Sequence, residues 1–238
     1  IGRCGEFGRR KEIFPAVFDT LGREYLEDTQ GCEVIVMDEL GFMESEAYAF
    51  RSAVLRALDG DVPVIAAVKD DDGLKKCLKT DSSIVFILYG DICNIPQIVE
   101  TVKSAGKIAM VHVDLIHGLS PKEIAIDFIH QYTKADGIIS TKALLIKRAS
   151  ELDLYTIHRF FVIDSMAYES IFKTMRTGKP DCIEILPALM PKVIQKLCKS
   201  SPIPVIAGGM VSEKEDIMAL LQAGAVSVSS TNQDTWFI

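Results

Sequence analysis

The chain has 238 residues, of which 48% are hydrophobic and 25% charged, and its formal net charge is −7. This composition is typical of a globular protein with a sizeable buried core, and the net charge argues against a wholly basic nucleic-acid binder. No apolar run reaches the roughly 18 residues of a membrane span, and the six cysteines include no CxxC pair. We therefore expect a cytoplasmic protein without a membrane partner, a metal site or a cofactor.

The N-terminal residues 1–61 predict one strand and one helix. Cys32–Met37 is an apolar strand, the acidic pair Asp38–Glu39 follows it, and Ser45–Leu58 has a helical pattern. One strand and one helix cannot bury an independent core. We expect a join to the rest of the chain near Asp59–Pro63.

An apolar strand that ends in Asp-Glu is typical of P-loop nucleoside triphosphatases, in which the carboxylates bind the magnesium shell and polarise water. The segment Val34–Leu58, VIVMDELGFMESEAYAFRSAVLRAL, resembles the second half of a small P-loop nucleoside-triphosphatase family. The GxxxxGK[ST] phosphate loop of that family is absent from the sequence. We therefore expect residues 1–61 to be a truncated triphosphatase-like fragment, a partial P-loop-type βα unit without hydrolase activity.

From residue 62 onward, short β-branched apolar runs alternate with helical patterns, which is typical of βα units with doubly buried parallel strands. Helical patterns occupy Ile95–Ala105, Pro121–Tyr132, Leu144–Leu152 and Glu213–Ala223. The expected strands are Val64–Val68, Ile84–Leu88, Ile108–Val113, Gly137–Ser140, Thr156–Ile163, Cys182–Leu186, Pro204–Ala207 and Val226–Ser229. Eight such units predict an α/β fold, a compact (β/α)8 TIM-like barrel over residues 62–238. An open doubly wound sheet is the alternative.

Polar residues follow nearly every predicted strand, where the working residues of a parallel barrel lie. The strongest indication is Gly208-Gly209 after the seventh strand together with Ser229-Ser230 after the eighth. Glycines let backbone N–H groups approach an anion, and hydroxyls add donors. These four residues predict a phosphate site.

Other strand ends supply cations, carboxylates and one imidazole for the polar part of a small ligand. His112 and Asp114 are two residues apart, so on one strand both side chains would point into the barrel mouth. They could be an acid/base pair or hydrogen-bond partners for hydroxyl groups. Lys142 could form a Schiff base, but a role as a cation for the phosphate or an acidic neighbour is favoured. The candidate ligand-binding residues are Lys69, Asp91, His112, Asp114, Lys142, Arg159 and Glu184.

Several motifs in this order carry a resemblance to a known family: VIAAVKD, VFILYGDI, VHVDLIHGL, DGIISTK, CIEILPALMPKVI, PVIAGGMV and AVSVSSTNQDTW. Over residues 62–238 the chain resembles the glycerol-3-phosphate-responsive antiterminators of bacterial glycerol-uptake operons. The resemblance implies a regulator, not an enzyme, that senses glycerol 3-phosphate and binds leader mRNA of glycerol-catabolism genes. It also implies that the phosphate meets Gly208, Gly209, Ser229 and Ser230.

A basic segment could meet the RNA. Residues 134–199 hold eleven Lys or Arg against seven Asp or Glu. The candidate RNA-binding residues are Lys147, Arg148, Lys173, Arg176, Lys192 and Lys196. A barrel enzyme acting on a small phosphorylated polyol, an isomerase, lyase or hydrolase, is the alternative function, and a homo-oligomer stays open.

Overall fold

The computed structural model describes residues 2–4, 11–13 and 64–237, and the chain divides into two units at Val62 and Pro63. In the first unit, strand β1 (Gly2–Cys4) pairs antiparallel with β2 (Lys11–Ile13). The strand and helix predicted for residues 32–37 and 45–58 lie outside the described residues.

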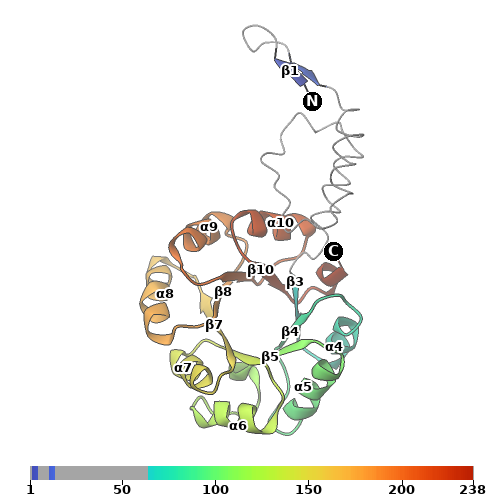
Figure 1. Cartoon of the computed structure of the whole chain (residues 1–238), viewed down its shortest axis with the longest axis vertical. Coiled ribbons are helices and arrows are strands. Elements are labelled where there is room, and N and C mark those ends of the chain that lie inside the picture. The colour runs from blue at the N-terminus through green and yellow to red at the C-terminus, as the bar shows by residue number, and fades with distance from the viewer. Residues whose placement is uncertain (1, 5–10, 14–63, 238) are drawn as a thin grey trace. The chain divides into compact units, whose positions relative to one another are not determined.

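The second unit is a closed barrel of eight parallel strands in the order β10-β3-β4-β5-β6-β7-β8-β9 (Figure 1). The predicted (β/α)8 barrel is therefore confirmed, and the open sheet is not formed. The strands are β3 (Val64–Val68), β4 (Ile84–Ile87), β5 (Ile108–His112), β6 (Gly137–Ser140), β7 (Tyr155–Phe161), β8 (Cys182–Leu186), β9 (Val205–Gly208) and β10 (Ser227–Ser230).

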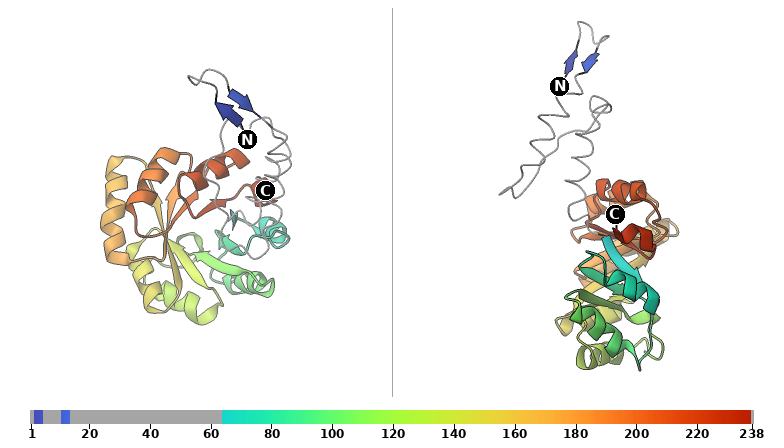
Figure 2. Two further views of the ribbon diagram at one scale, coloured as in Figure 1. Left: turned by 45° about the horizontal axis from the view of Figure 1, so that its top comes forward. Right: turned by 90° about the vertical axis from the view of Figure 1, so that its right-hand side faces the viewer.

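The helices form an outer ring around the strands (Figures 1 and 2). They are α4 (Asp71–Cys77), α5 (Ile95–Ser104), α6 (Ile124–Tyr132), α7 (Ala143–Glu151), α8 (Ser165–Gly178), α9 (Pro191–Ser200) and α10 (Lys214–Gln222). Two of them begin at an aspartate that follows a strand. Asp70 accepts a hydrogen bond from Gly73 N at 2.7 Å, and Asp164 accepts one from Ala167 N at 2.7 Å. Such N-caps satisfy free backbone donors of the first helical turn.

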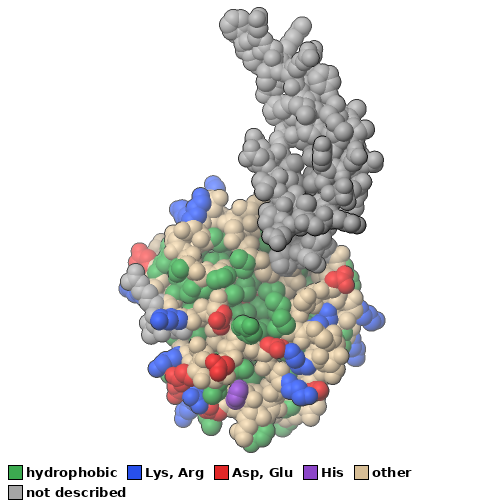
Figure 3. Space-filling model, in the orientation of Figure 1, with side chains coloured by type: hydrophobic (Ala, Val, Ile, Leu, Met, Phe, Trp, Pro, Cys, Tyr) green, Lys and Arg blue, Asp and Glu red, His purple; other side chains and the backbone are tan. Residues whose placement is uncertain are grey.

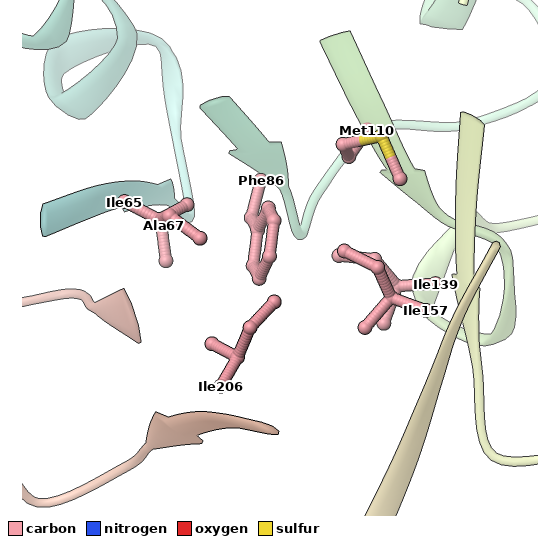
Figure 4. Packing of buried hydrophobic residues seen from close by; sticks show 7 residues of the cluster. All are labelled: Ile65, Ala67, Phe86, Met110, Ile139, Ile157 and Ile206. Atoms are coloured by element: carbon pink, nitrogen blue, oxygen red, sulfur yellow. The ribbon is translucent and has the colours of Figure 1, made fainter. Parts of the chain in front are cut away.

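Alternation along the strands sends one set of side chains inward and the other toward the helices. The inward set forms an apolar cluster in the barrel centre (Figure 4), namely Ile65, Ala67, Phe86, Met110, Ile139, Ile157 and Ile206. The outward set is equally apolar and lies against the helices; for example, Val85, Ile138 and Ile183 are fully buried. Burial on both faces explains why the strands read as continuous apolar runs.

The two ends of the barrel differ in chemistry. Where the strands begin, an apolar pocket of about 190 Å³ includes Ile84, Ile108 and Tyr155, and Figure 3 looks onto this end. Where the strands end, the inward positions that follow the apolar cluster become polar: Arg159 follows Ile157, and Gly208 follows Ile206. The strand ends thus position the candidate site. None of the described helices is long and apolar enough to cross a membrane.

Candidate functional site

A cavity of about 500 Å³ opens at the ends of the strands, between the loops that follow β8, β9 and β10. Its polar wall holds two cations, one carboxylate and several hydroxyl and amide groups, and its apolar wall holds leucines and Met210. Its lining residues are Ala67, Lys69, Leu88, Leu115, Arg159, Glu184, Leu186, Gly209, Met210, Val211, Ser212, Ser229, Ser230, Thr231 and Asn232. The described residues contain no cluster of His, Cys, Asp or Glu that could hold a metal ion.

The floor of the cavity is a buried polar network on three strands. Arg159 of β7 donates from Nε to Glu184 Oε2 of β8 at 2.6 Å, and Ser229 of β10 donates from Oγ to Glu184 Oε1 at 2.5 Å. Glu184 has no exposed surface, and the Arg159 side chain is 8% exposed. A buried charge pair of this kind is stable only when both ions are hydrogen-bonded, as here. The network fixes the Arg159 guanidinium and the Ser229 hydroxyl at the cavity wall.

Gly208 makes no side-chain hydrogen bond in this network, but its lack of a side chain leaves the room that the network needs. A Cβ atom at Gly208 would lie 2.3 Å from Ser229 Oγ and 2.7 Å from Glu184 Oε1. Residue 208 must therefore be glycine for the serine and the carboxylate to meet. Gly208 is not among the residues that line the cavity.

The loop after β9 presents free backbone donors. Gly209 and Met210 both have left-handed backbone conformations, with φ of +79° and +66°. Within the described part of the chain, the N–H groups of Gly209, Met210 and Val211 have no hydrogen-bond acceptor. Consecutive N–H groups in such a turn form a concave anion-binding nest. Lys69, at the end of β3, adds a cation to the same cavity.

Ser230, also predicted to bind phosphate, holds the two loops together. Its hydroxyl donates to Val211 O at 3.1 Å and accepts from Asn232 N at 3.0 Å. Its carbonyl accepts a hydrogen bond from Trp236 Nε1 at 2.8 Å. The Ser230 side chain is therefore engaged in shaping the cavity wall.

His112 and Asp114 do not share a strand. Strand β5 ends at His112, and Asp114 lies in a 3₁₀ turn, Val113–Leu115. The prediction that the two residues lie on one strand is wrong, because the strand ends before Asp114. Asp114 instead accepts hydrogen bonds from Lys142 Nζ and Thr141 N, both at 2.7 Å. Burial acts to raise its pKa, but these hydrogen bonds outweigh burial and hold the pKa below its usual range.

Asp114 and Lys142 therefore form an ion pair with each other. Neither residue lines the cavity. His112 is 3% exposed, and its Nδ1 has no partner in the described residues. Burial, reinforced by the nearby Arg159 charge, lowers the pKa of His112 to about 4. His112 is thus a neutral imidazole beside the floor of the cavity at neutral pH.

Asp91 is not among the residues that line the cavity. It follows Gly90, and its carboxylate accepts hydrogen bonds from Cys93 N at 2.7 Å and Asn94 N at 3.1 Å. This is the local turn that aspartate side chains favour. Of the seven predicted polar residues, the cavity brings together Lys69, Arg159 and Glu184.

The predicted basic residues lie on the outer helices α7, α8 and α9. Arg148 is bound to Asp127 at 2.5 Å and to Glu151 at 3.1 Å, and Lys147 lies 3.9 Å from Glu151. Lys192 and Lys196 lie on α9 without an ion-pair partner among the described residues. Lys173 lies on α8, and the side chain of Arg176 is outside the described part of the structure.

Sequence reasoning missed the apolar wall of the cavity. Leu88 and Leu186 stand at or just past strand ends, and Leu115 and Met210 are 44% and 72% exposed. In the sequence, an apolar residue directly after a strand looks like a continuation of that strand. Only its exposure in the structure shows that it belongs to the cavity wall and not to the core. Asn232, which donates from Nδ2 to Ser212 O at 3.1 Å, follows the eighth predicted strand as a polar residue but was not predicted to bind the ligand.

Comparison with known proteins identifies relatives of both parts of the chain. The family model described as glycerol-3-phosphate responsive antiterminator matches residues 64–236. Uncharacterized protein YgcP of Escherichia coli is 45% identical over 174 residues, which cover 73% of this chain and 91% of that protein. A family model described as NTPase matches residues 7–112. Nucleoside-triphosphatase THEP1 of Methanosarcina barkeri is 34% identical over 76 residues, 28% of this chain and 44% of that protein.

Solved structures support the same assignment for the barrel. The glycerol uptake operon antiterminator regulatory protein of Listeria monocytogenes is 33% identical with a TM-score of 0.71, covering 73% of this chain and 94% of that one. A glycerol uptake operon antiterminator-related protein of Thermotoga maritima is 32% identical with a TM-score of 0.65, covering 73% and 96%. Orotidine 5′-phosphate decarboxylase of Pyrococcus horikoshii, 15% identical with a TM-score of 0.52, shares the fold. The chain therefore belongs to the glycerol-3-phosphate responsive antiterminator family.

Proposed function

We propose that the chain is a glycerol 3-phosphate-sensing, RNA-binding antiterminator of glycerol-catabolism genes, and that its ligand binds in the cavity at the strand ends. The observation that carries the proposal is the set of unpaired N–H groups at Gly209–Val211, which share one cavity with Lys69 and Arg159. A phosphate monoester needs several donors and positive charge, and this combination supplies both.

The buried network gives each group a role in this proposal. The loop N–H groups, Lys69 and the Arg159 guanidinium meet the phosphate oxygens, while the Ser229 hydroxyl donates its one proton to Glu184. Glu184 holds Arg159 and Ser229 in place with its two oxygens.

The alternative is a barrel enzyme acting on a small phosphorylated polyol. Acid/base catalysis requires groups within hydrogen-bond reach of the reacting atoms. Among the described residues, Asp91 binds its own loop and Asp114 binds Lys142, which leaves Glu184, with both oxygens already hydrogen-bonded, as the carboxylate lining the cavity. This arrangement favours a sensor over an enzyme.

Calorimetric titration of glycerol 3-phosphate into the whole chain, and into Pro63–Ile238, tests the proposal. We expect saturable binding to both, with the ligand recovered intact after hours of incubation. Consumption of the ligand would favour the enzyme, and absence of binding to either form would remove the ligand assignment.

Gly209→Asp tests the location of the phosphate. The substitution places a carboxylate in the proposed anion site, so we expect glycerol 3-phosphate binding to fall by a hundredfold or more, about 2.7 kcal/mol. Gly106→Asp is the matched control, because Gly106 has a similar φ of +75° and no neighbouring atom within 4 Å of a new Cβ. Unchanged affinity in Gly209→Asp would place the phosphate elsewhere.

A further inference from the structure

The ligand cavity extends across the mouth of the barrel. In the closed strand order, β5 lies directly opposite β9. The cavity is lined by Gly209, in the loop after β9, and by Leu115, in the turn after β5. Eight parallel strands that lie about 4.8 Å apart enclose a mouth roughly 12–15 Å wide between backbones. Glycerol 3-phosphate held by its phosphate at Gly209–Val211 is therefore too short to reach the opposite side of the cavity.

The wall of the cavity is apolar both beside the proposed phosphate site and across the mouth from it. Leu186 lies against the loop after β9, because a Cβ atom at Gly209 would be 3.2 Å from its Cδ2. On the opposite side, Leu88 packs against the central apolar cluster and Leu115 is 44% exposed. Met210, which also lines the cavity, is 72% exposed. An apolar group of a ligand would thus meet leucines along the whole width of the mouth.

The polar groups of the cavity leave little capacity for further hydroxyl groups of a ligand. Glu184 accepts with one oxygen from Arg159 and with the other from Ser229. Asn232 accepts with its Oδ1 from Asp234 N at 3.1 Å. The carboxylate and amide oxygens that line the cavity are therefore already engaged. The cavity combines free donors for a phosphate with an apolar wall.

The apolar surface continues onto the rim of the mouth. Phe161, 53% exposed, is the last residue of β7 and shares the inward alternation of Arg159. Leu189, 45% exposed, lies in the loop after β8, whose residues 187–190 carry no charged or hydrogen-bonding side chain. Exposed apolar side chains gathered at one edge of a site indicate a binding surface. A long apolar group can leave the cavity over this loop without meeting a charge.

We propose that the cavity takes glycerol 3-phosphate that carries an acyl chain, with the phosphate at Gly209–Val211 and the chain on Leu88, Leu115 and Leu186. The inference rests on the proposed function, because it uses the same phosphate site and widens the ligand class. A chain attached to the ligand fits this wall better than a protein partner does, because the wall lies inside a cavity of about 500 Å³. Pockets of this size with apolar walls and a few polar groups are typical of ligands larger than glycerol 3-phosphate.

The experiment is calorimetric titration of the whole chain with glycerol 3-phosphate and with its butanoyl, hexanoyl and octanoyl esters, each below the concentration at which it forms micelles. A fully buried methylene group raises affinity about fourfold, and the partly exposed wall should give about half of that free energy, or about twofold. The octanoyl ester should therefore bind roughly fifteenfold more tightly than the butanoyl ester. Octanoyl glycerol, which lacks the phosphate, should bind roughly a hundredfold more weakly than the octanoyl ester.

Leu115→Asn tests the wall itself. The substitution replaces one apolar contact by a polar side chain, so the ratio of octanoyl to butanoyl affinity should fall from roughly fifteenfold to roughly fivefold. Leu144→Asn is the matched control, because Leu144 is 52% exposed at the start of α7 and does not line the cavity. It should keep the wild-type ratio. Because the ratio is measured within each variant, a general change in stability or in phosphate affinity cancels.

Equal affinities along the ester series, with glycerol 3-phosphate still bound, would overturn the acyl-chain inference and leave the proposed function standing. An equal loss of the ratio in both variants would also overturn it. A flat series together with a dimer that Leu115→Asn converts to a monomer in sedimentation would assign the wall to a second copy of the chain instead. Failure of glycerol 3-phosphate and of every ester to bind would overturn the proposed ligand site itself.

Discussion

Glu184→Gln separates the stability of the barrel from its affinity for anions. Glu184 is fully buried, and its carboxylate neutralises Arg159 across a 2.6 Å contact. Breaking a buried ion pair from one side costs about 3–5 kcal/mol, because the other charge stays buried without a partner. Glutamine keeps one acceptor oxygen, so we expect the lower end, about 3 kcal/mol of lost unfolding free energy.

The same substitution should tighten the binding of glycerol 3-phosphate. It removes a negative charge beside the proposed phosphate site and leaves the Arg159 cation uncompensated. At an effective dielectric constant of about 20, a unit charge about 4 Å from an anion contributes about 4 kcal/mol and less as the distance grows, so affinity should rise by roughly tenfold or more. Stability and affinity thus move in opposite directions.

Trp236 makes the stability measurement specific to the barrel. It is the sole tryptophan of the chain, is 5% exposed and donates to Ser230 O at 2.8 Å. Its fluorescence during urea unfolding reports the unit that contains the site, and calorimetry gives the affinity. Two controls accompany this variant. Ser229→Ala removes one hydrogen bond and should lower the unfolding free energy by about 1 kcal/mol. The double variant Glu184→Gln with Arg159→Met also loses the cation and should bind the ligand more weakly than wild type. Weaker binding to Glu184→Gln alone would refute the reasoning and show that Glu184 accepts a hydrogen bond from the ligand.

Two further substitutions test the groups beside the cavity. His112 has a pKa of about 4 in the folded chain against 6.5 for an unperturbed imidazole, so the unfolded chain binds the extra proton first as the pH falls. Stability should therefore decline from pH 6.5 to pH 4, by about 3 kcal/mol at most. Urea unfolding should show a smaller decline for His112→Gln, and parallel curves for the two proteins would contradict a neutral buried His112. Asp114→Asn weakens the hydrogen bonds to Lys142 and Thr141 and should lower the unfolding free energy by about 1–2 kcal/mol. Calorimetry should show unchanged affinity for glycerol 3-phosphate. A tenfold loss of affinity would place Asp114 in the ligand site.

The barrel could be predicted because its strands are doubly buried. The predicted strands Val64–Val68 and Cys182–Leu186 have the same bounds as the observed ones. A continuous β-branched apolar run between two amphipathic helices is typical of a parallel strand that is buried on both faces. Strand ends were less predictable. The predicted strand Ile108–Val113 ends one residue earlier, at His112, so that Asp114 lies in the 3₁₀ turn Val113–Leu115 and does not continue the alternation of the strand.

Side-chain partners could not be predicted, because they depend on contacts between elements distant in sequence. Arg148 reads as an exposed base of a helical pattern, and its carboxylate partner Asp127 comes from the neighbouring helix α6. Asp91 reads as a strand-end carboxylate, but a backbone turn two and three residues away competes for it. Arg159 and Glu184 were predicted to lie near the mouth, and only the register of β7 against β8 shows that they face each other.

The Gly208-Gly209 pair shows how one sequence motif serves two physical purposes. The sequence predicted that both glycines let the backbone approach a phosphate. In the structure, a side chain at Gly208 would displace Ser229 and Glu184, whereas Gly209 adopts a left-handed φ of +79° and begins the run of unpaired N–H groups. The first glycine therefore permits the network that orients Arg159, and the second shapes the loop that we propose receives the anion. Substitutions at the two positions should therefore weaken ligand binding for different reasons. A side chain at Gly208 would displace the groups of the cavity floor, whereas a side chain at Gly209 would change the loop after β9.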